Sequence, residues 1–557
     1  MRPRAFANSP LFALLAVFLL TWPALLAAQA SKPAPQVNPR GAFRIAGTVV
    51  NAKTSQPLAH AQVSVTNTKN SKDNQSMTTA DDGKFQFQVG SGKYSLQGAK
   101  RGFLTHAYEQ HENFWTGIVT GSGLDTETLV LRLPPAVMIT GKVTDEVGDP
   151  VRGATVTLFY ENHVAGIARI VQLRSVATDD LGTYEAPLLP AGTYFVSASA
   201  QPWYAQHPPS PLPGVDAVAV VDRNLDVAYP VSYYKDAARA DDATPIPVRP
   251  GDHAEVDFQL APTSALRLVL HAAADASGAF NVPAVQQPTL GGLTSPVPMQ
   301  ADQPSPGVYE LRGLPPGRYS LESHGSSDGN TKGSTDFELA NDGQEMDLSA
   351  GPPAATVKMT AQLQGATQLP PRLSLGLRDE KGNIGQFVEV NEKGEAELPG
   401  VLPGEYDVVA GGGQTAYSVS RITSEEVTTR GHRLSVAAGA TLPVSVTLVS
   451  GTATVEGFAQ RLGKPAAAAM IVLVPNDPES NPELFRRDQS DLDGSFALRG
   501  IVPGTYTVLA IEDGWELDWA KPAVIEIYRK RGQKLIVPDR MKGSLHLPGP
   551  VEVQPRL

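Results

Sequence analysis

The chain has 557 residues, which is too long for one ordinary domain, so several domains of roughly 100 residues each are expected. Its net charge of -11 at pH 7 argues against a general nucleic-acid binder. The chain has no cysteine, which excludes disulfide bonds, thiolate metal sites and a lipid-modified cysteine.

Residues 1–30 have the pattern of a secretory signal peptide: a basic "MRPR", an apolar "LFALLAVFLL" and a small-residue "AQA" at residues 28–30. Because the apolar stretch nearly reaches residue 28, an uncleaved anchor is the alternative. We expect residues 31–40, which include three prolines, to be a disordered lead-in. No later segment is apolar enough to predict a membrane span in the mature chain. An exported, acidic, cysteine-free protein is typical of bacteria, in the periplasm, on the outer-membrane surface or in the medium.

Five copies of one pattern follow, each with two glycine turns that flank an alternating strand. In the first copy, "KFQFQV" places Phe85, Phe87 and Val89 on one face of a strand between Gly83 and Gly92. Side chains that alternate with period two indicate half-buried strands, and glycine permits the tight turns between them. At roughly one copy per 100 residues, the repeat predicts one small β-sandwich per copy.

A tyrosine follows the second glycine turn of every copy, on the face of the strand that points to the core. A ring in this position fills the end of the core, and its hydroxyl reaches a backbone carbonyl in the preceding loop, as tyrosine corners do. Since a catalytic tyrosine is not needed five times, we predict a structural role for Tyr94, Tyr194, Tyr319, Tyr406 and Tyr506.

The front half of each unit reads as a strand, a polar turn with proline and a second strand. "GTVVNAKTSQPLAHAQVSV", with its glycine turns and "KYSLQGAKRGF", resembles the carboxypeptidase regulatory-like domain, as does "GKVTDEVGDPVRGATVTL" in the second copy. The resemblance implies a transthyretin-like β-sandwich, near the starch-binding-like folds. The fifth copy matches through its second half, whereas the third and fourth keep only the glycine pair and the tyrosine.

These observations predict an all-β protein of tandem Ig-like or transthyretin-like sandwiches, arranged end to end as an elongated rod. Short, proline-bearing junctions favour stiff connections. The expected parts after the lead-in are two carboxypeptidase regulatory-like domains at 41–134 and 135–262, the second with long loops, two divergent sandwiches at 263–350 and 351–450, a further carboxypeptidase regulatory-like domain at 451–539, and a loose tail at 540–557.

Catalytic patterns are missing from the sequence. It has no HExxH zinc-peptidase motif and no phosphate-binding GxxxxGK[ST] loop. Paired aspartates precede glycine in "TADDG", "TDDLG" and "SDLDG". They are interpreted as turn formers rather than calcium ligands, because aspartate bonds its own backbone in turns. We therefore expect no enzyme activity, no cofactor and no metal site.

Aromatic residues gather in long loops after the tyrosine strands. Beyond the signal segment, the tryptophans are Trp115, Trp203, Trp515 and Trp519. Rings beside polar groups are typical of sugar binding, so a ligand surface is predicted in the first two domains from Trp115, Trp203, Tyr204, Tyr233 and Tyr234, with His111, Glu112, His207 and Asp236 as polar partners. The alternative is that these rings cover loops or fill gaps between adjacent domains.

The sequence thus favours an exported, non-enzymatic protein that binds carbohydrate or displays a ligand at the cell envelope. Its partner would be a polysaccharide or an envelope or extracellular protein, and nucleic acid is not expected. A structural or adhesive spacer with protein partners and no small ligand is the alternative function.

Overall fold

The computed structural model describes residues 43–121, 123–209, 222–271, 284–324, 331–347, 354–366, 368–379, 384–412, 416–424, 429–430, 432–539, 541 and 543–557. The signal peptide predicted at 1–30 and the lead-in predicted at 31–40 lie outside these residues. What is described consists of many small sheets and one α-helix, in agreement with the predicted all-β class.

The first sandwich shows the plan on which the others are built. Its opening strand, β1, pairs antiparallel with β4 and parallel with β8, while the tyrosine-bearing β5 lies beside β2 in the opposing sheet. The sheet orders are β4-β1-β8 and β3-β2-β5-β6, with β7 also on β5. The strands are β1 (Phe43–Asn51), β2 (Gln62–Asn67), β3 (Asn74–Thr78), β4 (Lys84–Val89), β5 (Gly92–Ala99), β6 (His106–Ala107), β7 (Ile118–Thr120) and β8 (Leu129–Leu133).

The second sandwich repeats this plan and adds a long hairpin. Its opening strand β9 pairs antiparallel with β12 and parallel with β17, and β13 lies beside β10. The hairpin β10–β11 extends from the opposing sheet. The strands are β9 (Val137–Thr144), β10 (Thr155–Val164), β11 (Ile167–Ala177), β12 (Thr183–Leu189), β13 (Gly192–Ser199), β14 (Val227–Ala228), β15 (Ser232–Tyr233), β16 (Ile246–Val248), β17 (His253–Glu255) and β18 (Phe258–Gln259), with short 3-10 helices η1 (Arg223–Leu225) and η2 (Ala240–Asp242).

The third and fourth sandwiches keep the same pairings although their sequences diverge. The third has sheets β23-β24-β20-β27 and β22-β21-β25-β26. Its elements are β19 (Thr263–Ser264), β20 (Leu266–His271), β21 (Ala284–Pro288), η3 (Leu290–Gly292), β22 (Thr294–Pro296), β23 (Gln300–Ser305), β24 (Val308–Leu314), β25 (Gly317–His324), β26 (Thr331–Leu339) and β27 (Gln344–Asp347). The fourth has sheets β31-β28-β36-β33 and β30-β29-β32-β35-β34. Its strands are β28 (Ala355–Leu363), β29 (Ser374–Asp379), β30 (Val388–Glu389), β31 (Glu395–Val401), β32 (Gly404–Gly411), β33 (Ala416–Thr423), β34 (Thr429–Arg430), β35 (Arg433–Val436) and β36 (Thr441–Gly451).

The fifth sandwich includes the residues that were expected to form a loose tail. β45 pairs in parallel with both β37 and β42 and so joins the two sheets, and Val551 and Val553 are buried in the core. The expectation of a tail at 540–557 is therefore wrong for the described residues 543–554. The elements are β37 (Ala453–Arg461), β38 (Lys464–Pro465), β39 (Met470–Pro475), η4 (Pro482–Leu484), β40 (Arg486–Gln489), β41 (Ser495–Ile501), β42 (Gly504–Ile511), η5 (Gly514–Glu516), α1 (Pro522–Arg529), β43 (Gln533–Val537), β44 (Gly543–His546) and β45 (Val551–Gln554).

Each sandwich has its own core, which its alternating strands form. In β4, buried and exposed residues alternate strictly, so Phe85, Phe87 and Val89 all enter the first core. The opening strands of the first two domains carry Gly47 and Gly141 opposite the parallel partner strand. A Cβ at either position would lie about 2 Å from a backbone carbonyl oxygen of that partner, so only glycine allows the close approach.

The repeated tyrosines lie at the ends of these cores. In the second to fifth copies the phenol donates a hydrogen bond to the carbonyl four residues earlier: Tyr194 to Pro190 at 2.7 Å, Tyr319 to Pro315 at 2.5 Å, Tyr406 to Leu402 at 3.0 Å and Tyr506 to Val502 at 3.0 Å. Burial raises the pKa of the Tyr506 phenol to about 12. Each hydroxyl therefore satisfies a loop carbonyl that the core would otherwise leave unpaired.

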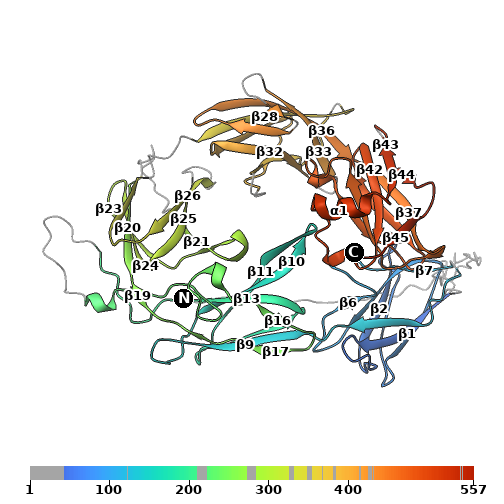
Figure 1. The fold of residues 1–557 in the computed structure, drawn as a ribbon, viewed down its shortest axis with the longest axis horizontal. Coiled ribbons are helices and arrows are strands. Elements are labelled where there is room, and N and C mark those ends of the chain that lie inside the picture. Colours follow the sequence, from blue (N-terminus) through green and yellow to red (C-terminus); the bar gives the residue numbers. More distant parts are fainter. Residues whose placement is uncertain are drawn as a thin grey trace, which may run out of the picture.

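The five sandwiches follow one another around a ring, and the fifth (red) returns to lie against the first (blue) (Figure 1). Hydrogen bonds between residues more than 370 positions apart hold these two domains together. The expectation of an elongated, end-to-end rod is therefore wrong in this respect. Successive domains turn in one direction around the ring (Figure 1), and polar and aromatic contacts between the terminal domains close it.

Candidate functional site

The aromatic loops of the first and fifth domains meet face to face. The His111 ring stacks on the Trp515 indole, with ring centroids 5.2 Å apart and planes 4° from parallel. The neighbouring carboxylate of Glu112 accepts two hydrogen bonds from the Arg487 guanidinium, at 2.9 and 2.8 Å. Two residues predicted to bind a ligand thus bind another domain of the same chain.

Arg487, on β40, is the centre of this contact. Its guanidinium carbon lies 4.6 Å from the ring centroid of Trp519, 5.2 Å from that of Phe114 and 5.7 Å from that of Trp515. A guanidinium held among aromatic faces and paired with a carboxylate is a strong contact when water is excluded. Trp515 and Trp519 are 6% and 3% exposed, so these indoles are packed and not free to stack on a sugar.

A buried polar seam runs beside the aromatic contact. The Gln489 side-chain amide donates to the Glu109 carbonyl at 2.5 Å and to the Thr116 hydroxyl at 2.8 Å. The Asp491 carboxylate accepts from the backbone N–H of Gly117 at 2.9 Å and pairs with the ammonium of Lys93. Burial raises the pKa of the Asp491 carboxyl, an effect that Lys93 opposes. The "SDLDG" turn therefore serves as an interdomain contact as well as a turn.

The tip of the β10–β11 hairpin of the second domain reaches the same place, near α1 (Figure 1). The Gly166 carbonyl accepts from the backbone N–H of Ala520 at 3.1 Å, and the N–H of Ala168 donates to the Asp518 carboxylate at 2.6 Å. Gly166 has φ +79°, and a Cβ there would lie 2.2 Å from the Trp519 ring. Three domains thus meet around the loop 512–521, which we call the three-domain junction together with residues 109–117, 163–168 and 487–492.

Two further predicted residues lie between the second and third domains. Tyr233 is buried in a cluster with Phe159 and Leu290, the last from the third domain. The His207 ring accepts or donates a hydrogen bond with Asp226 at 2.9 Å, and its carbonyl accepts from Arg312 on β24. These side chains pack domains together, as the alternative interpretation of the loops expected.

The remaining predicted residues are divided between two places. Trp115 is half-buried, with the Lys93 ammonium 5.9 Å from its ring centroid. Trp203 is 88% exposed and meets the ring of Tyr204 edge-on at 5.9 Å. Tyr234 is half-buried and Asp236 is exposed, both on the loop after β15. The nine predicted residues therefore do not form a single surface.

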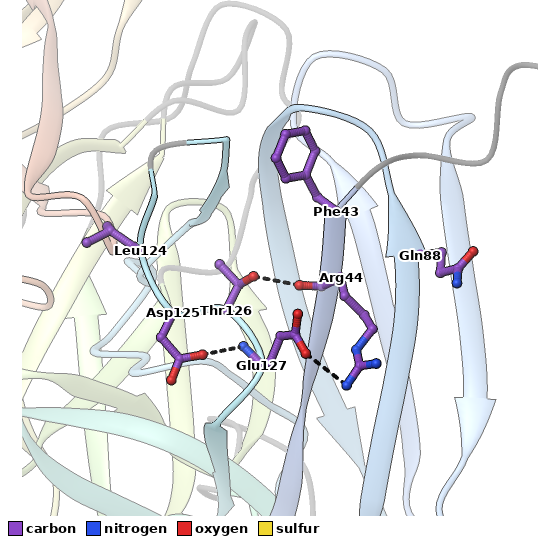
Figure 2. Close-up of a pocket in the computed structure, with 7 residues that line it drawn as sticks. All are labelled: Phe43, Arg44, Gln88, Leu124, Asp125, Thr126 and Glu127. Carbon is purple, nitrogen blue, oxygen red and sulfur yellow. Dashed lines mark hydrogen bonds and ion pairs between the residues drawn. The ribbon is translucent and has the colours of Figure 1, made fainter.

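A shallow pocket of about 580 Å³ lies beside the start of β1 and contains none of the predicted residues (Figure 2). The guanidinium of Arg44 pairs with Glu127 at 2.8 Å, and the Arg44 carbonyl accepts from the Thr126 hydroxyl at 2.5 Å. The carboxylate of Asp125 accepts from the backbone N–H of Glu127 at 2.8 Å. Because these groups bond one another, the pocket presents no evident chemistry for a reaction.

Within the described ranges, no group of three or more histidine, aspartate or glutamate side chains is placed to hold a metal ion. The aspartates of the glycine turns bond their own turns: Asp179 accepts from the backbone N–H groups of Leu181 at 2.9 Å and Thr183 at 2.8 Å. None of the described helices is long and apolar enough to cross a membrane.

Residues 44–120 and 138–261 match the family model of the carboxypeptidase regulatory-like domain. The chain carries carboxypeptidase regulatory-like domains in tandem. These two domains supply residues 109–117 and the hairpin tip 163–168 of the three-domain junction, so both regulatory-like domains contact the fifth sandwich directly.

Several solved structures align with this chain at low identity. The Bacillus anthracis TIE protein aligns at 15% identity over 73% of this chain and 74% of its own, with a TM-score of 0.17. The streptococcal ancillary pilin aligns at 12% identity over 51% of this chain and 98% of its own (TM-score 0.20), and the shaft pilin SpaA from Lactobacillus rhamnosus GG at 10% over 40% and 98% (TM-score 0.18). No curated protein matches the sequence.

The sequence did not single out Arg487, Gln489, Phe114 or Gly166 of the junction. They come from three segments far apart in the sequence, and only the fold brings these segments together. Phe114 had one detectable signal, because it adjoins His111, Glu112 and Trp115 in the same aromatic loop of the first regulatory-like domain.

Proposed function

We propose that this protein is a non-enzymatic structural scaffold of tandem β-sandwiches that acts through protein partners at the cell envelope. The observation that carries the proposal is the contact of Glu112 and His111 with Arg487 and Trp515. Two of the candidate ligand-binding residues, His111 and Glu112, instead contact the fifth domain. A scaffold needs such fixed geometry, whereas a flexible chain of binding modules does not.

The packing of the junction supports this proposal. Trp515 and Trp519 belong to a buried cluster made mainly of fifth-domain residues, and Phe114 of the first domain packs against it. The side chain of Arg487, which pairs with Glu112, is only 12% exposed. The loop of the first domain therefore meets a surface that is already packed within the fifth.

Export is part of the proposal, because the basic and apolar pattern of residues 1–30 is that of a secretory signal. Cell fractionation and N-terminal sequencing of the exported protein test it. Cleavage after Ala30 and recovery outside the cytoplasm are expected, and an intact N-terminus in the cytoplasmic fraction contradicts it.

Carbohydrate binding is the second candidate, and the 88% exposure of Trp203 favours it. A glycan-array screen separates the two functions. The scaffold predicts that the wild-type protein retains no glycan above background, while the junction variant Arg487→Ala opens the ring. Saturable retention of one glycan by the wild type, lost in Trp203→Ala, would instead establish the carbohydrate function.

A further inference from the structure

A carboxylate is held beside the exposed tryptophan of the second domain, away from the three-domain junction. The Glu146 carboxylate accepts a hydrogen bond from the Tyr229 phenol at 2.9 Å and a second from the Tyr204 phenol. Tyr204 in turn meets the exposed Trp203 ring edge-on. Two tyrosines from separate segments of the long loop thus orient one carboxylate, and Tyr204 links it to the exposed indole of Trp203.

The hydrogen-bond donors of the two phenols and of the turn that carries Glu146 are already used. Both phenols donate to the Glu146 carboxylate, and burial together with this bond raises the pKa of Tyr204 to about 12. The turn that carries Glu146 directs its amides to Asp145: Val147 at 3.1 Å and Asp149 at 2.8 Å to the carboxylate, and Gly148 at 3.1 Å to the carbonyl. What this turn and the two phenols offer a ligand is therefore acceptor atoms and a negative charge.

No ion pair to a lysine, arginine or histidine engages Glu146 among the described side chains. The hydrogen bonds from Tyr204 and Tyr229 outweigh partial burial and lower the pKa of Glu146, so the carboxylate is ionised at neutral pH. An acceptor-only anion beside an aromatic face fits a cation better than a neutral sugar, because a guanidinium or ammonium carries donors only and is attracted to the ring.

We propose that Glu146, Trp203, Tyr204 and Tyr229 form a binding site for an arginine or lysine side chain of a partner protein. The cation pairs with Glu146 and lies over the Trp203 indole. The assignment of the cation to a partner protein rests on the proposed scaffold function. The preference of the site for a cation does not depend on that function. The net charge of -11 also favours a basic partner.

The test uses the full-length exported protein labelled with 5-fluorotryptophan, with the Trp203 signal assigned from Trp203→Phe. The probe is the capped peptide Gly-Gly-Arg-Gly-Gly, and its neutral control carries citrulline in place of arginine. The arginine peptide is expected to shift the Trp203 fluorine resonance with a Kd on the order of millimolar, a weak contact typical of one exposed cation. The citrulline peptide should leave the resonance unchanged.

Variants distinguish the site from general charge attraction. Glu146→Gln should weaken the arginine peptide at least about tenfold, and Tyr204→Phe by several-fold, because the carboxylate loses its orientation. The matched control Glu185→Gln removes one exposed charge of the same domain from β12 and should change the affinity little. Equal shifts by both peptides, or affinity that survives Glu146→Gln, overturn the proposal. If a neutral oligosaccharide shifts the Trp203 resonance equally in wild type and Glu146→Gln, the site binds sugar and the proposed cation site is wrong. That outcome would not bear on ring closure, which depends on other residues.

Discussion

Arg487 of the fifth domain and Glu112 of the first form a two-point ion pair, with nitrogen–oxygen distances of 2.9 and 2.8 Å, across 375 positions of sequence. Their side chains are 12% and 26% exposed, so water screens the pair only in part. The contact joins the two ends of the domain series, and its loss should be visible in the shape of the whole molecule.

Arg487→Ala should open the ring. The change removes the ion pair with Glu112 and also the cation that lies among three aromatic rings. The free energy of the contact between the first and fifth domains should weaken by about 2–4 kcal/mol. Small-angle scattering should show a larger maximum dimension than that of the wild type. The control is Arg44→Ala, whose partner Glu127 lies in the same domain and whose side chain is 46% exposed. Identical scattering for wild type and Arg487→Ala would show that the pair does not hold the ring.

Gly166→Ala should displace the hairpin tip from Trp519. Alanine is strained at the positive φ of this position, and its Cβ would lie 2.2 Å from the Trp519 ring. Gly153→Ala is the matched control in the same domain, because Gly153 has φ +71° but nothing lies within 4 Å of its added Cβ. Only Gly166→Ala should red-shift the tryptophan fluorescence as Trp519 becomes hydrated. If both variants have the same emission, the hairpin does not cover that ring.

Trp203→Ala and Trp519→Ala should differ sharply in stability. Trp519 is 3% exposed, so its truncation leaves a cavity that should lower the free energy of unfolding by about 3–5 kcal/mol. Trp203 is 88% exposed, and its removal should change stability by less than about 0.5 kcal/mol. Urea unfolding of the two variants measures the difference. A large loss in Trp203→Ala would mean that its ring is covered in solution.

Tyr506→Phe should lower the stability of the fifth domain by about 1–3 kcal/mol, because the Val502 carbonyl loses its donor. Tyr506→Ala should cost about 3–5 kcal/mol, since a cavity forms as well. Differential scanning calorimetry should assign both losses to a transition of that domain. Equal melting of Tyr506→Phe and wild type would contradict a structural role for the hydroxyl.

Asp488 should make stability fall as the pH rises. Burial raises the pKa of its carboxyl above the usual aspartate range, although the backbone amides of Ala497 and Gln489 oppose this at 2.7 and 2.8 Å. Because the folded-state pKa exceeds the unfolded one, the stabilisation is present in acid and is lost as pH rises through the raised value. The Tm of Asp488→Asn minus that of wild type should therefore increase from about pH 4 to about pH 7. A difference that stays constant or falls would show that burial does not control this carboxyl.

The strands and turns within each repeat follow from local pattern. "KFQFQV" alternates with period two, and the tyrosine after each second glycine turn lies on the buried face, so the unit could be predicted from a few neighbouring residues. The resemblance of the first two copies to the regulatory-like domain rests on the same local turns and strands. The short strand Val551–Gln554 was missed because four residues carry too little periodicity to predict a strand.

Ring closure and the use of the aromatic loops were decided only by the tertiary structure. Trp515 and His111 could be named from the sequence as aromatic and polar loop residues, but whether they face a ligand or each other depends on the angles at four domain junctions. Those angles add up along the chain, and no local pattern encodes their sum. The same holds for Glu146, an ordinary turn residue in sequence, which the fold places beside Tyr204 and Tyr229 because their separate loop segments pack over one end of the second sandwich.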